Sequence, residues 1–299
     1  MTGTLRQRVE SWLAAPVRDE VRAFAERLAH EAGAAAVLFY GSNLRTGSLD
    51  GVLDFYLLKD SAEPERIWPR VSYHECEEGG QVLRAKAATM DLATFAAAAK
   101  GTLLDTTIWA RFTQPSALLW QRQRKAARAV KAAICDAVCT ATRTAAVLGP
   151  AKGAQDAYWT ALFRATYRAE FRVEAPGREA SILDAHSAHF DGLLTLGWTA
   201  QNLAFARDGQ TLAPQLSTAQ RKHVLRWWRT RRRLGKPLNI ARLIKASTTF
   251  EGAARYAAWK IERHSGVPVA LTPWREKHPV LAAPRVLFDV WRKTRRNRS

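Results

Sequence analysis

The residues best suited to chemistry lie between positions 37 and 58. An apolar run ends in Gly41 and Ser42, and after a short loop a second apolar run carries Asp54 near its start. A glycine lets a polyphosphate approach the backbone, a serine offers a hydroxyl, and a carboxylate can hold a divalent metal ion. This spacing is typical of a nucleotidyltransferase active site. An ordinary turn between two core strands explains the same residues equally well.

Strands must position these side chains. The apolar runs at 34–39 and 52–58 predict a hairpin-like pair of buried strands. Residues 81–88, which include Lys86, predict a third strand, and an apolar run that ends at Trp120 is consistent with one more.

Helical spacing of apolar residues dominates the rest of the chain. Residues 4–32 predict two short amphipathic helices separated at Pro16, and Asp91 is placed to cap a helix over 92–99. Further helices are predicted over 121–147, 153–173, 179–196, 221–233 and 239–264. After them, prolines at 268, 273, 279 and 284 predict short broken pieces before a basic tail.

The order of these elements predicts an α+β fold. We expect a nucleotidyltransferase-type domain with a mixed sheet over residues 1–120. A helical domain, with a winged-helix-like arrangement as one option, is expected over 121–215. Residues 216–299 then form a basic, Trp-bearing helical region.

The charge of the chain is concentrated at its C-terminal end. The 299 residues carry a formal net charge of +19, and residues 201–299 contain 22 Lys and Arg against 5 Asp and Glu. Such a region attracts nucleic acid, an anionic membrane or phosphorylated substrates. The start of the chain lacks an apolar signal core, and no segment has the ~20 continuous apolar residues that cross a bilayer. A soluble or peripheral protein is therefore expected.

The three cysteines are few and odd in number, which argues against a disulfide framework and indicates a reducing compartment. Cys135 and Cys139 have the i, i+4 spacing of a helix. Two core thiols explain this pair better than a metal site, because no further ligand lies nearby in the sequence.

Four blocks of sequence follow one another along the chain: residues 40–42 with 53–55, Lys86 with 91–92, residues 109–115, and residues 166–172. In this order they resemble the mitochondrial-type phosphatidate cytidylyltransferases, which are CDP-diacylglycerol synthases of the polymerase-β-type superfamily. The blocks are similar to the family's Tyr-Gly-Ser-Gly with an apolar-Asp-apolar strand, its lysine-bearing strand, its Gly-Arg-Leu-x-Lys-Pro segment and its Ser-Tyr-x-Gly-Asp-x-Arg segment. A weaker likeness continues to about residue 260.

The chain departs from the family pattern at three positions, where Asn43 replaces a Gly, Gln114 a Lys and Glu170 an Asp. Val52 also occupies the place where the wider superfamily carries the first carboxylate of an Asp-x-Asp pair, and metal-assisted transfer usually uses two or three carboxylates. Asp50 is a substitute from the loop, although Asp before Gly is also a common turn.

The resemblance implies transfer of CMP from CTP to phosphatidate with Mg²⁺, which yields CDP-diacylglycerol and pyrophosphate. It implies that Asp54, with Asp50 as a second candidate, ligates Mg²⁺, and that Lys86 and Arg111 neutralise phosphate charge. The nucleotide would be cradled by Tyr40, Gly41, Ser42 and Asn43.

Several of these side chains also have a purely structural explanation. Lys86 is equally at home on a strand edge, and Arg111 could pair with Asp105 on a surface. His74 could contact nucleotide or metal, but a single histidine is more often exposed or satisfied. Two assignments stay open. A further metal carboxylate could be Glu75, Glu77 or Glu78. The segment with Tyr167, Glu170 and Arg172 could contact the substrate or lie at a domain interface.

The basic C-terminal region suits a lipid substrate. Trp227 and Trp228 stand among arginines, and amphipathic rings of this kind settle in the headgroup zone of an anionic membrane. A core-facing position for one of the two is the alternative. We expect a cytoplasmic protein, peripheral on the inner face of the cell membrane or of a mitochondrial-type inner membrane. A nucleic-acid-binding or tRNA-type nucleotidyltransferase-fold protein and a non-catalytic membrane scaffold remain competing hypotheses.

Overall fold

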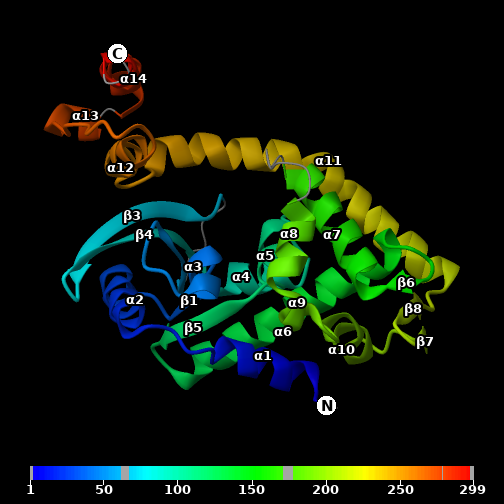
Figure 1. The fold of residues 1–299 in the computed structure, drawn as a ribbon. Coiled ribbons are helices and arrows are strands. Elements are labelled where there is room, and N and C mark those ends of the chain that lie inside the picture. Colours follow the sequence, from blue (N-terminus) through cyan, green and yellow to red (C-terminus); the bar gives the residue numbers. More distant parts are fainter. Residues whose placement is uncertain (1–2, 62–66, 171–177, 278, 297–299) are drawn as a thin grey trace.

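A five-stranded mixed sheet forms the centre of the computed structural model, which describes residues 3–61, 67–170, 178–277 and 279–296. Its strands lie in the order β3-β4-β2-β1-β5 (Figure 1). They are β1 (Ala36–Tyr40), β2 (Leu53–Lys59), β3 (Arg70–Glu78), β4 (Gln81–Asp91) and β5 (Ser116–Gln121). Only the β2–β4 pair is parallel. The predicted α+β fold is confirmed, and the edge strand β3 is the sheet element that the sequence pattern missed.

The two faces of the sheet are covered by different helices. Alternate residues of the strands, such as Phe39 and Phe55, pack against α2 (Asp19–Ala32). The other set, such as Leu38 and Tyr56, packs against α4 (Leu92–Ala99), α5 (Thr107–Arg111) and α6 (Arg124–Leu148). Because side chains alternate along a strand, this division also decides which face each polar residue reaches. The helix α1 (Leu5–Leu13) packs against α6.

The predicted cap of α4 is only half right. Asp91 occupies the N-cap position, but its side chain makes no capping hydrogen bond. One of its carboxylate oxygens is buried and has no hydrogen-bond partner among the residues that the structure describes.

The middle of the chain is mainly helical. Its helices are α7 (Gln155–Glu170), α8 (Arg178–Ala185), α9 (Ser187–Phe190) and α10 (Leu193–Ala200), so the single helix predicted over 179–196 is wrong. A small sheet, in the order β6-β8-β7, was not predicted; it consists of β6 (Gly153–Ala154), β7 (Phe205–Asp208) and β8 (Thr211–Pro214). One hydrophobic cluster runs from the central sheet through α6, α7 and α10, across the predicted boundary near residue 120.

Two helices of the C-terminal region contain an internal proline, and of the two prolines only Pro284 was expected to break the chain. The helix α11 (Thr218–Thr249) continues through Pro237, and α14 (Pro279–Arg296) continues through Pro284. α11 packs closely on α7, where a Cβ on Gly235 would lie 2.5 Å from the carbonyl oxygen of Ala169. This packing offsets the hydrogen bond that a helical proline removes.

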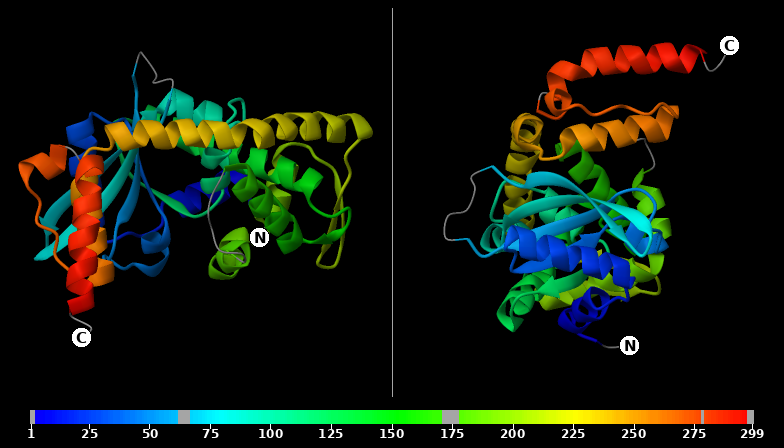
Figure 2. Two further views of the ribbon diagram at one scale, coloured as in Figure 1. Left: turned by 90° about the horizontal axis from the view of Figure 1, so that it is seen from above. Right: turned by 90° about the vertical axis from the view of Figure 1, so that its left-hand side faces the viewer.

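The remaining helices are α12 (Ala253–Ser265) and α13 (Pro273–Lys277), so the predicted helix over 239–264 is interrupted before residue 253. Figure 2 shows that α11 and α14 lie on the same side of the molecule.

Candidate active site

The register of the central sheet brings three of the predicted site residues side by side. Tyr40 of β1 pairs with Asp54 of β2, and Asp54 pairs with Lys86 of β4. Residues opposite one another on adjacent strands point to the same face, so three side chains that are far apart in the sequence meet. The Nζ atom of Lys86 lies 3.6 Å from Oδ1 of Asp54, and both side chains remain partly exposed. Such a pair contributes at most ~1 kcal/mol to stability, which leaves its charges available to a ligand.

Gly41 fits tightly beside the carboxylate of Asp54. It has φ +92°, and a Cβ at this position would lie 3.1 Å from Oδ2 of Asp54. Only glycine adopts this backbone conformation without strain. The next residue, Ser42, begins the short helix α3 (Ser42–Thr46) and is exposed. Residues 41–42 therefore present a bare backbone and a hydroxyl directly next to the carboxylate.

Arg111 reaches the same place from α5. Its Nη1 atom donates a 2.7 Å hydrogen bond to the hydroxyl of Tyr40. Burial alone would lower the pKa of the Arg111 guanidinium, but Tyr40, Tyr56, Glu170 and Asp54 outweigh it and hold this pKa above its ordinary value. Burial also raises the pKa of Tyr40, so its hydroxyl stays protonated. Arg111 is therefore a permanent cation whose direction is fixed by a neutral phenol.

The surface pairing considered for Arg111 is wrong. Asp105 instead forms an ion pair with Arg242 of α11 and accepts a hydrogen bond from the backbone nitrogen of Ile108. These contacts fasten the start of α5 to α11, and they leave Arg111 directed at Tyr40.

Tyr40, Gly41, Ser42, Asp54, Lys86 and Arg111 line one cavity of about 620 Å³. Its remaining lining residues are Arg45, Gln114, Pro115, Tyr167, Ile182, Ala185 and His186. Gln114 and Tyr167 belong to the blocks that carry the family resemblance. Arg45, Ile182, Ala185 and His186 had no sequence signal, because α8 and α9 reach the cavity only through the tertiary fold.

Two predicted residues do not line this cavity. The side chain of Asn43 donates to the backbone oxygens of Ser48 and Asp50, at 2.9 and 2.8 Å, and so holds the loop after α3. Asp50 is exposed within that loop. The expected roles of Asn43 in nucleotide binding and of Asp50 in metal binding are not supported by this arrangement, since neither residue lines the cavity that holds Asp54.

The further carboxylates suggested by the sequence also lie elsewhere. Glu75 accepts hydrogen bonds from Tyr73 and Arg84 on the β3–β4 ribbon, and neither Glu77 nor Glu78 lines the cavity. Buried Glu170 accepts a hydrogen bond from Thr106. Arg172 lies outside the described residues.

The donor set of the cavity fits a single magnesium ion better than a pair. Asp54 is the one carboxylate among the lining residues, and no cluster of three His, Cys, Asp or Glu side chains occurs in the part of the chain that the structure describes. Mg²⁺ is often held by one or two carboxylates together with substrate phosphates and water. One ion on Asp54 is compatible with these residues, whereas a two-metal site would need a second carboxylate.

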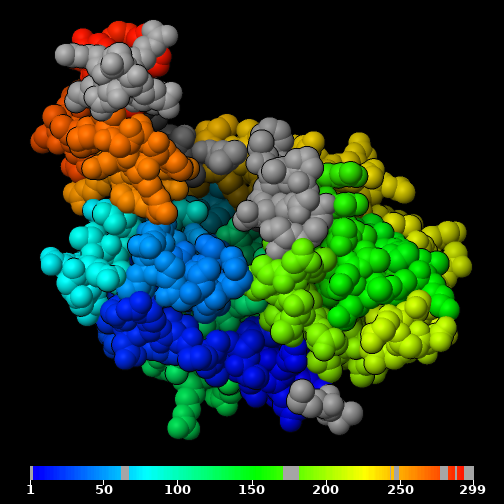
Figure 3. All heavy atoms as spheres, in the orientation of Figure 1, coloured from blue at the N-terminus to red at the C-terminus, as the bar shows by residue number. Residues whose placement is uncertain are grey.

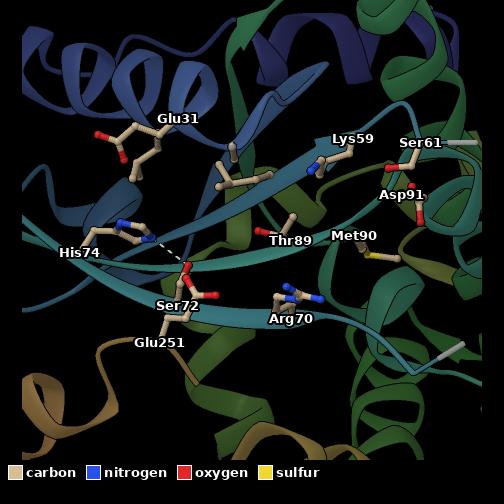
Figure 4. Close-up of a pocket in the computed structure, with 13 residues that line it drawn as sticks. Glu31, Lys59, Ser61, Arg70, Ser72, His74, Thr89, Met90, Asp91 and Glu251 are labelled. Atoms are coloured by element: carbon tan, nitrogen blue, oxygen red, sulfur yellow. Dashed lines mark hydrogen bonds between the residues drawn. The ribbon is translucent and has the colours of Figure 1, made fainter. Parts of the chain in front are cut away.

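A second cavity of about 510 Å³ lies on the opposite face of the sheet (Figure 4). It holds His74, whose Nε2 atom lies 2.7 Å from the hydroxyl of Ser72. Burial lowers the pKa of His74. Lys59 and Arg70 share this cavity with Glu31, Asp91 and Glu251, so acidic and basic groups are mixed. The predicted catalytic residues all face the other cavity, and His74 is not among them.

The two tryptophans assigned to a membrane pack on the protein instead, because Trp228 belongs to the hydrophobic cluster and Trp227 lies partly buried against it. The expected membrane contact is therefore wrong for Trp228, and the core-facing alternative holds for it. Trp228 is only 5% exposed and both rings pack against Trp109. The indole nitrogen of Trp227 also donates to the carbonyl of Gly101. Cys135 and Cys139 likewise pack partly buried against the hydrophobic cluster, as predicted.

Other aromatic residues of the C-terminal region are exposed. Trp274 of α13 and Phe288 and Trp291 of α14 are each more than half exposed. Figure 3 shows this segment projecting from the body of the molecule. Among the described residues, no helix combines the length and the apolar character required to cross a membrane.

The chain matches no model of a known protein family, and no curated protein is similar to it.

Proposed function

We propose that the chain is an Mg²⁺-dependent nucleotidyltransferase that transfers CMP from CTP to phosphatidate at a membrane surface. The observation that carries the proposal is the convergence of Gly41, Asp54, Lys86 and Arg111 on one cavity. The nucleotide and lipid assignments come from the resemblance of the four sequence blocks. Residues from all four blocks line this one cavity although the blocks lie far apart in the sequence, which supports the resemblance.

The chemistry needs positioning and charge neutralisation more than covalent help. An oxygen of the phosphatidate phosphate forms a bond to the α-phosphorus of CTP, the bond from that phosphorus to the bridging oxygen breaks, and pyrophosphate leaves. The attacking phosphate is already an anion at neutral pH, so no protein group has to remove a proton from it. A magnesium ion on Asp54 would supply charge compensation for the phosphates.

The residues of the chain have separate tasks in this scheme. Gly41 lets the triphosphate approach the backbone, and Ser42 offers a hydroxyl to it. Lys86 lies beside Asp54 and balances phosphate charge there, while Arg111 can offer two N–H groups to a phosphate. The hydrogen bond from Arg111 to Tyr40 fixes its orientation before substrate arrives, which lowers the entropic cost of binding.

The C-terminal helices suit the membrane part of the proposal. α14 carries exposed Phe288 and Trp291 together with exposed Arg285 and Arg292. The outward side of α11 adds a row of exposed basic residues, Arg221, Lys222, Arg226, Arg229, Arg232, Arg233 and Lys236. Basic residues near an anionic leaflet each contribute about 1 kcal/mol, and aromatic rings insert at the interface. α13 and α14 thus take the role first given to Trp227 and Trp228.

The direct test is an assay of purified protein with Mg²⁺, labelled CTP and phosphatidate liposomes. We expect a labelled CDP-lipid and equimolar pyrophosphate. A wild-type protein that makes no such product, yet retains RNA tightly at moderate salt, would support the nucleic-acid-binding alternative. Binding to liposomes without product or nucleotide binding would instead support a membrane scaffold.

A further inference from the structure

Positive charge outweighs negative charge among the described residues that line the active-site cavity. Of these residues Arg45, Lys86 and Arg111 are cations, and Asp54 is the only acidic one. Lys86 already lies beside Asp54, and Arg111 is bonded to Tyr40. Arg45 is exposed and forms no salt bridge or hydrogen bond through its side chain within the described ranges. A cation without a partner in a cavity is suited to an anionic ligand group.

His186 comes to the same cavity from the helical half of the molecule. It lies between α8 and α9, while Arg45 lies on α3 beside the sheet (Figure 1). Both side chains line the same cavity. Burial lowers the pKa of His186, and the positive charge of Arg45 lowers it further. The imidazole is therefore neutral near pH 7, with one N–H to donate and no charge of its own.

Apolar side chains accompany this pair. Ile182 and Ala185 of α8 line the cavity next to His186 in the sequence, and Pro115 lies after α5. The wall that carries His186 thus offers a hydrogen-bond donor beside hydrocarbon surface. The sheet-side residues Gly41, Asp54 and Lys86 offer only polar groups. The cavity is consequently divided into a polar part and a mixed polar and apolar part.

We propose that Arg45 and His186 form the acceptor subsite and bind the phosphomonoester headgroup of a lipid. This inference rests on the proposed nucleotidyl transfer, because that reaction needs a second substrate in line with the donor triphosphate. Arg45 supplies a planar fork that matches phosphate oxygens, and His186 donates one further hydrogen bond. Ile182 and Ala185 contact the glycerol and the first part of an acyl chain.

Arg45 favours a phosphate acceptor over a hydroxyl acceptor. Lys86 and Arg111 lie beside Asp54 and Tyr40, where the proposed donor triphosphate and its Mg²⁺ bind, whereas Arg45 has neither an ion pair nor a side-chain hydrogen bond among the described residues. Its charge is therefore available to an anionic second substrate, and a hydroxyl acceptor would gain nothing from it.

Steady-state kinetics with each substrate varied in turn test the assignment. For Arg45→Gln and His186→Ala, we expect the KM for phosphatidate in liposomes to rise at least tenfold and the KM for CTP to stay within twofold. Arg45→Lys should recover part of the loss, since it keeps the charge but not the fork. Arg207→Gln on β7 is the matched control, because Arg207 is exposed and does not line the cavity.

A binding measurement separates this inference from the proposed function. Dihexanoyl phosphatidate, a soluble phosphomonoester, is titrated without nucleotide and compared with dihexanoyl glycerol, which ends in a hydroxyl. Wild-type binding of the phosphate form only, lost in both cavity variants, supports the subsite even if the wild type transfers no CMP. Unchanged phosphate affinity in the variants, a rise in the KM for CTP alone, or equal binding of the hydroxyl form overturns it.

Discussion

The cavity around Asp54 and the basic C-terminal region use charged and aromatic residues in opposite ways. In the cavity the charges face inward and are oriented by protein partners, as when Tyr40 holds Arg111. In the C-terminal region most basic side chains of α11 face outward, and the aromatic residues are divided between core and surface. Trp228 and Trp291 stand in similarly basic surroundings in the sequence, but only Trp291 is exposed. The sequence therefore shows that both regions are rich in charged and aromatic residues, but the packing decides which of these side chains are buried and which are exposed.

The largest effect is expected from replacing Asp54, the one acidic side chain among the described residues that line the cavity. Asp54→Asn keeps the shape of the side chain but removes the charge that we expect to hold Mg²⁺ and to balance Lys86. Transfer of CMP to phosphatidate should fall by at least about 100-fold, in line with the loss of other electrostatic groups in active sites. The thermal midpoint should change little, because the Asp54–Lys86 pair is partly exposed.

Asp208→Asn is the matched control for that experiment. Asp208 is also paired with a lysine, Lys152, at 3.1 Å, but this pair is more exposed and lies in the small sheet. Its replacement should leave the rate unchanged. Equal rates for Asp54→Asn and the wild type would remove Asp54 from the mechanism.

Replacing buried Trp228 or exposed Trp291 should change the free energy of unfolding by very different amounts. Trp228→Ala opens a cavity in the core beside Trp109 and should reduce the free energy of unfolding by about 3–5 kcal/mol. Trp291→Ala changes an exposed ring, so its effect should stay within about 0.5 kcal/mol. Urea denaturation followed by circular dichroism measures both. A comparable loss in the two variants would mean that α14 is packed as firmly as α11.

The sequence predicts the sheet-side part of the candidate site better than any other part of the molecule. Gly41 and Asp54 stand at the end and near the start of apolar runs, Lys86 lies within a predicted strand, and a two-residue period fixes the face on which each strand side chain lies once the strands pair. That local information suffices for three strands. It does not predict β3, whose Glu75, Glu77 and Glu78 hide the alternation of an edge strand.

The parts that sequence reasoning missed depend on contacts between distant segments. Arg45 and His186 meet in one cavity only because α8 and α9 fold back toward α3. The orientation of Trp227 depends on a bond to Gly101, which lies 126 residues away. Pro284 was expected to break the chain into short pieces, but α14 continues through it, and α11 continues through Pro237 while it packs on α7. None of these effects is encoded in a window of a few residues.

A smaller disturbance of the cavity is expected from Gly41→Ala. The added methyl group meets Oδ2 of Asp54 at 3.1 Å and requires a positive φ, so Asp54 and the backbone must shift. We expect roughly a tenfold loss in kcat/KM, with a stability loss of about 1 kcal/mol. Gly209→Ala also imposes a positive φ, of +56°, but with nothing near its Cβ, so it should cost stability without loss of activity. Activity lost equally in both would point to strain rather than to the contact with Asp54.

The smallest effect should come from the exposed aromatic pair of α14. Phe288→Ser with Trp291→Ser removes rings that are 57% and 51% exposed, and partial burial of the two rings together in a lipid interface stabilises binding by about 1 kcal/mol. Affinity for anionic liposomes should therefore fall about fivefold. The remaining binding should be weakened by salt because exposed basic residues persist on α11. Sedimentation with anionic and neutral liposomes measures both effects. Val82→Ser, which changes an exposed apolar residue of β4, should leave binding unchanged. If the double variant binds as the wild type does while salt still releases it, the contact is made by the basic side of α11 alone, and the aromatic residues of α14 have no part in it.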